Sequence, residues 1–301
     1  MWLHTKGVSY ITHQTKNIIL ASNAGFCYGV KRAVETTKKL KAENPNKEIC
    51  VLGELIHNSQ VIKELNDLGI KTIETLPEHG CGYCVVRSHG ASFEIFESIK
   101  EKGFELVDLT CPDVKKVQDK AIELVQENYF LIILGKGEHP EVMAIRANAI
   151  RHTEDSNVFV AQNLDELKKI EDVIRKKSKV GIVVQTTQRA EFLQEIVAYL
   201  APITKELKIA NTICRSTTLR QNEAREVAKK SDLMIVVGSK KSANTTHLAE
   251  ILKDITKTIH IENASELKNF EEEVQLAQTI GITAGASTPD YIINEVIDSV
   301  K

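Results

Sequence analysis

The chain has 301 residues, of which 42% are hydrophobic and 27% charged. This composition is typical of a globular protein and excludes a disordered or collagen-like chain, while the length predicts two or three domains. The formal net charge of −2 is too small to attract nucleic acid or an acidic membrane surface, so we expect neither as a partner.

The N-terminal segment does not resemble an export signal. His4, Lys6, His13 and Lys16 interrupt any apolar core, and no apolar run along the chain reaches the roughly 20 residues that cross a bilayer. We therefore predict a cytoplasmic protein with residues 1–16 as an N-terminal extension; import into an organelle through this extension is the alternative. The six cysteines are then expected to be reduced, which favours metal or redox roles over disulfides.

Short apolar runs alternate with segments of helical periodicity, as in parallel α/β units. In chain order, the predicted strands cover residues 17–21, 49–53, 84–87, 105–109, 129–134, 158–160, 180–184, 207–211, 232–237, 258–261 and 279–283. The clearest helical segments are residues 31–41, 61–68, 115–127, 190–200 and 220–230.

Three cysteines occupy the same place in this pattern, because each follows a predicted strand and precedes a predicted helix. They are Cys27, Cys111 and Cys214, separated by 84 and 103 residues, each about the length of one small domain. Polar residues recur at two later strand ends of each unit. They are His57 and His89 in the first unit, His139, Glu141, Thr186 and Thr187 in the second, and Ser242, Asn244 and Ser287 in the third.

This long repeat predicts three similar small α/β domains with parallel sheets, arranged with pseudo-threefold symmetry around a central site. The predicted domains are residues 17–110, 111–210 and 211–301. Ligands of open α/β sheets bind beyond the carboxyl ends of the strands, where all the repeated polar residues lie. We therefore expect the three domains to direct these residues at one shared centre, in a self-contained monomer.

Three cysteines at helix starts indicate a metal site. A helix N-terminus stabilises a thiolate, so we expect lowered thiol pKa values. Three thiolates suit zinc or an iron–sulfur cluster and leave one coordination position open for catalysis. A zinc hydrolase or lyase and a non-enzymatic iron–sulfur sensor are the rival interpretations. Taken singly, each cysteine could also be a small buried apolar residue.

The other three cysteines are not expected to bind metal. Cys81 and Cys84 form a CxxC pair, but they precede a strand and no second CxxC accompanies them. Cys50 lies inside an apolar strand and is predicted to be a core residue.

The repeated polar residues predict an anion site. His57, His89, Ser242, Asn244 and Ser287 could bind a phosphate or diphosphate through hydrogen bonds, with helix N-termini adding favourable dipoles. The alternatives are that the histidines are satisfied core residues and that the serines and asparagine are helix N-caps.

Glu141 is the best candidate for a general acid. It follows Pro140, which suits a first helical position, and would point into the centre. Thiolates and a bound diphosphate nearby would raise its pKa, so that it carries a proton at neutral pH. Thr186 and Thr187 could orient a substrate hydroxyl or hold Glu141 in place. A surface glutamate at a helix start is the alternative for Glu141.

Nine ordered motifs carry a resemblance to a known family: GFCYGVKRAV, ELIHNSQVIKEL, VRSHG, DLTCPDV, HPEV, VQTTQ, NTICRSTTLRQ, VVGSKKSANTTHLAEI and GITAGASTPDYII. From about residue 17 to the C-terminus, the chain resembles 4-hydroxy-3-methylbut-2-enyl diphosphate reductase, the last enzyme of the methylerythritol phosphate route to isoprenoids.

The resemblance implies a reductive dehydroxylation that yields isopentenyl and dimethylallyl diphosphate. It implies one 4Fe-4S cluster on Cys27, Cys111 and Cys214, an open iron for the substrate hydroxyl, and two electrons from a ferredoxin- or flavodoxin-like donor. Glu141 matches the proton-delivery residue of the family. The residues that match its substrate-binding positions are His57, His89, His139, Thr186, Thr187, Thr217, Ser242, Asn244 and Ser287.

The chain departs from the family pattern at two places. Ala243 stands where many members have a second serine before the asparagine, and GKGE precedes HPEV where many have another histidine and glycine. The contacts that those residues make in other members are therefore not expected here.

Overall fold

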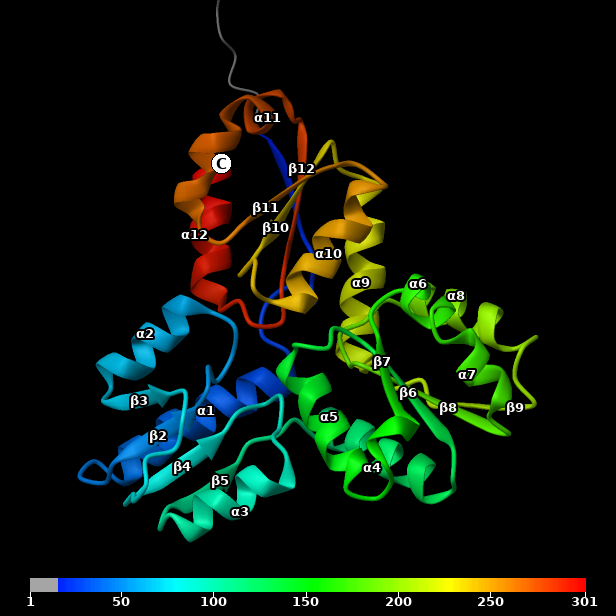
Figure 1. Ribbon diagram of the computed structural model, residues 1–301. Helices are drawn as coiled ribbons and strands as arrows, with labels where there is room; N and C mark the ends of the chain where they lie inside the picture. The colour runs from blue at the N-terminus through cyan, green and yellow to red at the C-terminus, as the bar shows by residue number, and fades with distance from the viewer. Residues whose placement is uncertain (1–15) are drawn as a thin grey trace, which may run out of the picture.

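The computed structural model describes residues 16–301 and contains three sheets of four parallel strands (Figure 1). The predicted fold class, three parallel α/β units, is confirmed. In spatial order the sheets are β3 (Ile70–Ile73), β2 (Ile49–Leu52), β4 (Tyr83–Val86), β5 (Glu105–Asp108); β7 (Val158–Ala161), β6 (Phe130–Leu134), β8 (Lys179–Val184), β9 (Glu206–Ile209); and β1 (Asn17–Leu20), β12 (Thr279–Ala284), β10 (Leu233–Val237), β11 (Lys257–Ile261).

Helices connect these strands and cover the sheet faces. They are α1 (Tyr28–Glu43), α2 (Ser59–Asp67), α3 (Phe93–Glu101), α4 (Pro112–Gln126), α5 (Pro140–Ile150), α6 (Leu164–Lys168), α7 (Glu171–Lys176), α8 (Ala190–Leu200), α9 (Arg215–Ala228), α10 (Ala243–Lys253), α11 (Glu271–Leu276) and α12 (Asp290–Val300), with 3₁₀ turns η1 (Asp155–Asn157) and η2 (Ala264–Phe270). Within residues 16–301, every helix is too short or too polar to span a bilayer. The predicted role of residues 1–15 lies outside the described residues.

Each sheet is buried on both faces, as parallel sheets normally are. The central strands β6 and β10 are apolar and fully buried, whereas the edge strands β1 and β9 are partly exposed. Two apolar clusters cover the two faces of each sheet. Cys50 is 3% exposed and packs in one of them, in keeping with its predicted core position.

The pairing of β1 corrects one feature of the predicted organisation. The strand near residue 17 was assigned to the first repeat, but β1 pairs in parallel with β12 of the third sheet. In the same way, β5 closes the first sheet and leads to Cys111, while β9 closes the second and leads to Cys214. Each unit is therefore completed by the strand that precedes the next cysteine, and β1 closes the ring. Apart from this strand, the division at residues 110 and 210 stays a prediction.

One strand was not predicted. β3 has only four residues, and it follows α2 directly through Gly69, whose φ of 79° ends the helix in the left-handed region. A strand this short carries too little alternation to be distinguished from a loop by periodicity.

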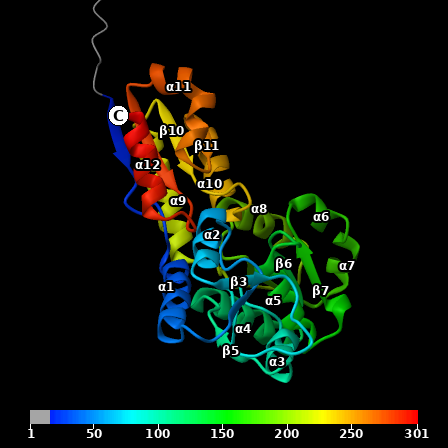
Figure 2. The same cartoon turned by 90° about the vertical axis from the view of Figure 1, so that its left-hand side faces the viewer.

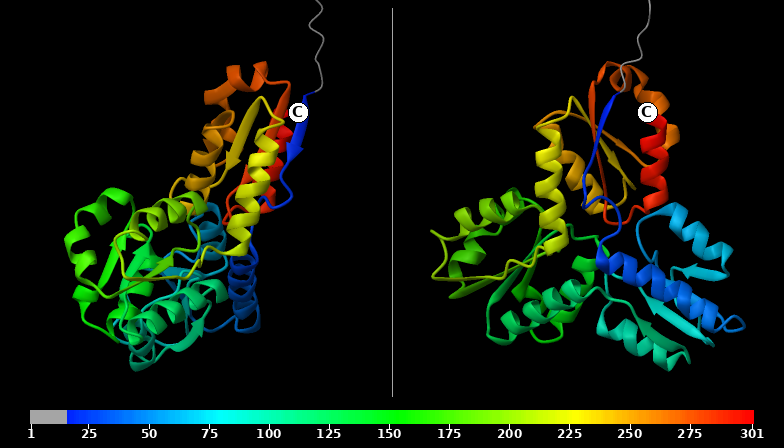
Figure 3. Two further views of the ribbon diagram at one scale, coloured as in Figure 1. Left: turned by 90° about the vertical axis from the view of Figure 1, so that its right-hand side faces the viewer. Right: turned by 180° about the vertical axis from the view of Figure 1, so that it is seen from behind.

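The three units surround a common centre. Figure 2 shows the third unit standing beside the other two, and Figure 3 shows α1, α4 and α9 converging when the molecule is seen from behind. The loops that precede these helices carry the three repeated cysteines. The fold thus brings equivalent helix starts from all three units to one place.

Ile282 tests how strongly the stability of the third unit depends on its apolar core, because this fully buried residue lies in β12 between β1 and β10. We expect Ile282→Ala to lower the free energy of unfolding by about 2–5 kcal/mol, since it removes buried methyl groups and leaves a cavity. Urea unfolding followed by circular dichroism would measure the change. The matched control is Leu276→Ala, a position that is 76% exposed, where we expect a change within about 0.5 kcal/mol. Equal effects at the two sites would contradict this assignment of the core.

Candidate active site

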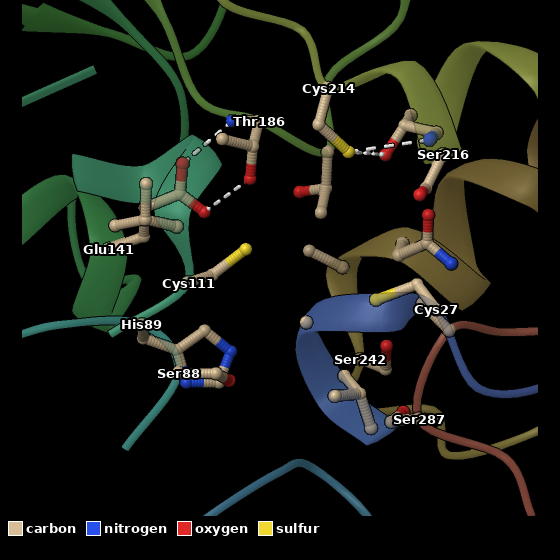
Figure 4. A pocket seen from close by; sticks show the side chains of 18 of the residues that line it. Cys27, Ser88, His89, Cys111, Glu141, Thr186, Cys214, Ser216, Ser242 and Ser287 are labelled. Atoms are coloured by element: carbon tan, nitrogen blue, oxygen red, sulfur yellow. Dashed lines mark hydrogen bonds between the residues drawn. The ribbon is translucent and has the colours of Figure 1, made fainter. Parts of the chain in front are cut away.

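Each of the three repeated cysteines is the N-cap residue of a helix. Cys27 precedes α1, Cys111 precedes α4 and Cys214 precedes α9, all with the extended backbone that is usual at an N-cap. Their thiols are free, and Figure 4 shows the sulfur atoms facing a common space. The arrangement lets one soft metal group contact all three sulfurs.

Gly29 determines how closely two of these sulfurs approach the backbone. A Cβ atom at this position would lie 2.7 Å from Cys111 Sγ and 4.0 Å from Cys27 Sγ. Real Cβ atoms essentially never come as close as 2.7 Å to another heavy atom. Glycine inside a helix lowers stability by about 0.5–1 kcal/mol relative to alanine. The space that the two sulfurs need gives a physical reason for a glycine at this position of α1.

Burial changes the expected ionisation of the thiols. We predicted lowered pKa values from the helix N-termini, but desolvation raises the pKa of Cys111 and of Cys214. Backbone N–H groups of α4 and α9 oppose this shift without overcoming it. That prediction is therefore wrong for these two residues. Thiolates at this depth need a bound metal or another positive charge as a partner.

Arg220 supplies one such charge. Its guanidinium is 3% exposed and donates through Nη2 to the Gly25 carbonyl oxygen at 2.6 Å. Its Nε and Nη1 have no hydrogen-bond partner among the described residues. Burial lowers the pKa of Arg220, whereas negative charge on Cys27 and Cys214 would raise it. Two unpartnered donors beside the thiols fit a bound anionic group such as a thiolate-ligated iron–sulfur cluster.

Glu141 is a buried acid and not a surface residue. It is 1% exposed in the first turn of α5, and Thr186 holds both of its carboxylate oxygens. The Thr186 N–H donates to Oε1 at 2.7 Å and the Thr186 hydroxyl to Oε2 at 2.8 Å (Figure 4). Burial raises the pKa of Glu141 to about 7, although these two hydrogen bonds act in the opposite direction. The expected direction is confirmed, but its cause is desolvation and not like charge.

Three histidines gather at another wall of the cavity. His57, His89 and His139 have ring centroids 4.8–5.9 Å apart, and each offers a nitrogen within 4.8 Å of the others. Burial lowers the pKa of His139 to about 3 and that of His89 well below its usual value, so both are neutral at pH 7. The Glu141 N–H donates to His139 Nδ1 at 3.2 Å, which leaves Nε2 to carry the proton.

The hydroxyl and amide side chains of the third unit make no helix-capping hydrogen bonds. Ser242 occupies the N-cap position of α10 without a capping hydrogen bond, and Asn244 lies inside the helix with Nδ2 unpartnered. Ser287 precedes the N-cap Pro289 of α12 and donates to the His57 carbonyl oxygen at 3.3 Å. The capping alternative is thus wrong for Asn244 and Ser287, while Ser242 holds the N-cap position without using its hydroxyl as a cap. These buried polar groups are available to a ligand instead.

One cavity, enclosing about 720 Å³ with its mouth, contains all of these groups. Every residue that sequence analysis singled out for the site lines it, including Thr187 and Thr217. Thr217 lies against Cys214, with its N–H 3.4 Å and its hydroxyl 3.1 Å from the sulfur. The structure thus brings the predicted residues together, and their individual roles remain predictions.

Sequence analysis missed several lining residues: Ser88, Asp113, Ser216 and Arg220. All four stand inside motifs quoted for the resemblance, beside or shortly after a selected residue. Helical i, i+3 spacing from Thr217 could have found Arg220. Cys81 is exposed and Cys84 is buried in the first sheet, and neither lines this cavity.

The chemistry of the cavity is divided. Thiols and a buried guanidinium belong to the helix starts. Imidazoles, hydroxyls and an amide line the rest of the wall, together with the protonatable Glu141. Such a site can hold a metal group, an anionic substrate and a proton donor in one enclosed volume. This combination is what a metal-dependent enzyme acting on a small anion requires.

Comparison with known proteins agrees with the assignment of this chain as an enzyme. A profile of the LytB protein family matches residues 18–301. A curated relative from Syntrophotalea carbinolica, named 4-hydroxy-3-methylbut-2-enyl diphosphate reductase, is 42% identical over 287 residues, which cover 94% of this chain and 98% of the relative. A protein of the same name from Aquifex aeolicus is 39% identical over 291 residues, covering 95% and 96% of the two chains.

Two solved structures show the same fold. The structure described as that of (E)-4-hydroxy-3-methyl-but-2-enyl diphosphate reductase, the terminal enzyme of the non-mevalonate pathway, aligns with a TM-score of 0.69 at 37% identity, covering 95% of this chain and 99% of its own. The Plasmodium falciparum reductase structure aligns with a TM-score of 0.84 at 28% identity, covering 94% and 87%. The chain belongs to the LytB family of oxidoreductases, and the resemblance predicted from its motifs is confirmed.

Gly29 tests the geometry of the thiol site. We expect Gly29→Ala to displace Cys111 Sγ, so that anaerobic reconstitution leaves less than half of the wild-type iron and sulfide per chain. Gly137→Ala is the matched control, because a Cβ there would meet nothing closer than Val160 Cγ1 at 3.9 Å. Iron and sulfide analysis measures both, and full loading of Gly29→Ala would show that the sulfur does not need this space.

Proposed function

We propose that this enzyme reductively dehydroxylates (E)-4-hydroxy-3-methylbut-2-enyl diphosphate to isopentenyl and dimethylallyl diphosphate, and so forms isoprenoid precursors. The substrate takes up two electrons and two protons, its C–O bond breaks, and the hydroxyl leaves as water. The observation that carries the proposal is the single cavity that joins three thiols, the Glu141–Thr186 pair and an unsatisfied polar wall. The names of the relatives support the same substrate.

Cys27, Cys111 and Cys214 would hold one 4Fe-4S cluster with a fourth iron that has no protein ligand. When bound, the cluster supplies one-electron transfer and a Lewis acid for the substrate oxygen. The raised thiol pKa values support this assignment because bound iron would stabilise the thiolates. The free donors of Arg220 support it because a thiolate-ligated cluster is anionic overall. Thr217 donates to the Cys214 sulfur, a contact of the kind that adjusts cluster potential.

The polar wall would bind the diphosphate. His57, His89 and His139 surround one volume, and Ser242, Asn244 and Ser287 supply further donors from the third unit. An arriving diphosphate would favour protonation of His89 and His139, which burial keeps neutral in the free protein, and would so strengthen its own binding. Ala243 lines the cavity without a hydroxyl, so the neighbouring Ser242 and Asn244 carry this part of the wall.

Glu141 would deliver the proton that converts the leaving hydroxyl to water. With a pKa of about 7, it is protonated in a large fraction of molecules at neutral pH. Thr186 fixes the direction of the Glu141 carboxyl group. The His139 side chain accepts a hydrogen bond from the backbone N–H of Glu141. Enclosure in the cavity limits side reactions of the reducing electrons with water.

The remaining requirements lie outside the cavity. Two electrons must come from an external donor of the ferredoxin or flavodoxin type, and we propose that the enzyme acts as a cytoplasmic monomer. Closure of the three-unit ring by β1 within one chain supports the monomer, because no second chain is needed to complete a sheet.

The proposal is tested by an anaerobic visible spectrum with iron and sulfide analysis, followed by turnover with reduced methyl viologen. A brown protein that converts the allylic diphosphate into the two products supports it. Zinc in place of iron would favour the hydrolase or lyase, and a stable cluster without turnover would favour a sensor.

Replacement of the proton donor separates binding from chemistry. We expect Glu141→Gln to keep the cluster spectrum and the substrate Kd but to lower kcat about 10²- to 10⁴-fold, the usual effect of removing a general acid. The control is Glu138→Gln, an exposed acid in the loop that precedes α5, for which we expect the wild-type kcat. An unchanged rate in Glu141→Gln would assign the proton to another group.

The pH profile tests the Glu141–Thr186 contact. A required acid is active in its protonated form, so kcat/KM should fall as the pH rises through about 7. The Thr186 hydroxyl lowers the pKa of Glu141, so Thr186→Val should raise it and move this falling limb to higher pH. Thr258→Val, remote from the cavity, should leave the limb in place. A limb that moves to lower pH in Thr186→Val would contradict the assignment.

A further inference from the structure

The starts of α1, α4 and α9 form a distinct surface, the rear face, defined here as the first two turns of these helices. Seen from behind, the three helices surround the centre of the molecule (Figure 3). Their N-cap residues are the three repeated cysteines, so the thiols come near the surface here. Tyr28 marks the nearest point, because it is 49% exposed and its hydroxyl lies 3.8 Å from Cys111 Sγ.

Basic side chains gather on the rear face in spite of the helix dipoles. Cations are normally disfavoured at helix N-termini, yet neither α1 nor α9 has an acid in its first turn. The first seven residues of α1, α4 and α9 together carry six basic residues and one acidic residue, in a chain of net charge −2. The exposed cations near the helix starts are Lys31, Arg32, Lys115, Lys116 and Arg215.

Two of these cations are engaged within the chain, because Lys115 pairs with Asp108 and Arg32 donates to the carbonyl oxygens of residues 109 and 110. The other three are more available to a partner. Lys116 contacts Asp113 at 3.0 Å, but the same carboxylate also accepts from the Tyr28 hydroxyl at 2.8 Å. Lys31 lies 3.9 Å from Glu35 in a fully solvated pair, which holds it weakly. Arg215 forms no ion pair with any residue in 16–301. Since each charge is exposed, the rear face presents a positive field around the thiol-bearing helix starts.

Exposed apolar groups also lie on these helix starts. Tyr28 is 49% exposed and Leu219 is 44% exposed, on α1 and α9. An apolar contact area with a charged rim is the usual composition of a protein interface. Small, weak interfaces of this kind are typical of transient redox complexes, in which charge complementarity steers the partners together.

We propose that the rear face docks an acidic one-electron carrier protein, such as an acidic plant-type ferredoxin. The inference rests on the proposed function, since it supplies the electrons of that reaction. Two successive carriers are each oxidised by one electron, and the two electrons with two protons break the substrate C–O bond and release water. The polar wall is reserved for the diphosphate, so a carrier at the rear face reaches the thiol side without displacing substrate.

The test reverses one charge on each helix in the cluster-loaded enzyme: Lys31→Glu, Lys116→Glu and Arg215→Glu together. Acids near a helix start complement its dipole, so the variant is expected to fold. The matched control is Lys169→Glu, Lys253→Glu and Lys268→Glu, three exposed positions away from the rear face with the same change in net charge. Calorimetric titration measures the Kd for an acidic 2Fe-2S ferredoxin, and turnover is followed with that ferredoxin and, separately, with reduced methyl viologen.

We expect the rear-face variant to raise the Kd and the KM for ferredoxin at least tenfold, while its viologen-driven turnover stays within twofold of wild type. In the control variant, the Kd, the KM and the viologen-driven turnover should all equal those of wild type. Raising the salt concentration to 0.5 M should weaken ferredoxin binding to wild type but hardly change the viologen rate. Equal Kd values for the two triple variants would overturn the docking site. Absence of viologen-driven turnover in wild type would instead overturn the proposed function, since no docking is needed there.

Discussion

The structure depends on the burial of three thiols where three helix N-termini meet. Each cysteine ends a strand-to-helix connection of one α/β unit, so the centre exists only when all three units are in place. Gly29 gives the sulfurs room, and Arg220 places a positive charge beside them. Because β1 pairs with β12 in the third sheet, the first and last strands must come together before this centre is complete.

Desolvation gives the cavity its chemical character. The same burial raises the pKa of Glu141 and of two thiols and lowers that of His89 and His139. In each of these cases the neutral form is favoured, so these five groups add little charge to the free site. An anionic substrate or a metal group bound beside them would change their ionisation, which ties the charge of these residues to occupancy.

Much of the site could be read from the sequence because it follows from repetition. Cysteines and polar residues stand after equivalent strands, and strand ends of parallel sheets share one edge, so the convergence on one cavity follows from spacing. The thiol pKa values could not be predicted this way, because desolvation depends on depth within the assembled units. The hydrogen bonds from Thr186 to Glu141 join residues 45 positions apart, and their geometry depends on packing of α5 against the end of β8.

Alone, the sequence determined the α/β class, the three equivalent units and the chemical types that face the centre, since periodicity and turn positions are local properties of the chain. Only the tertiary structure decided the partner of β1, the isolation of Glu141 from solvent and the meeting of basic helix starts on the rear face. Those features arise from contacts between segments far apart in sequence, where a residue's burial and neighbours, and not its type, determine its charge and its partners.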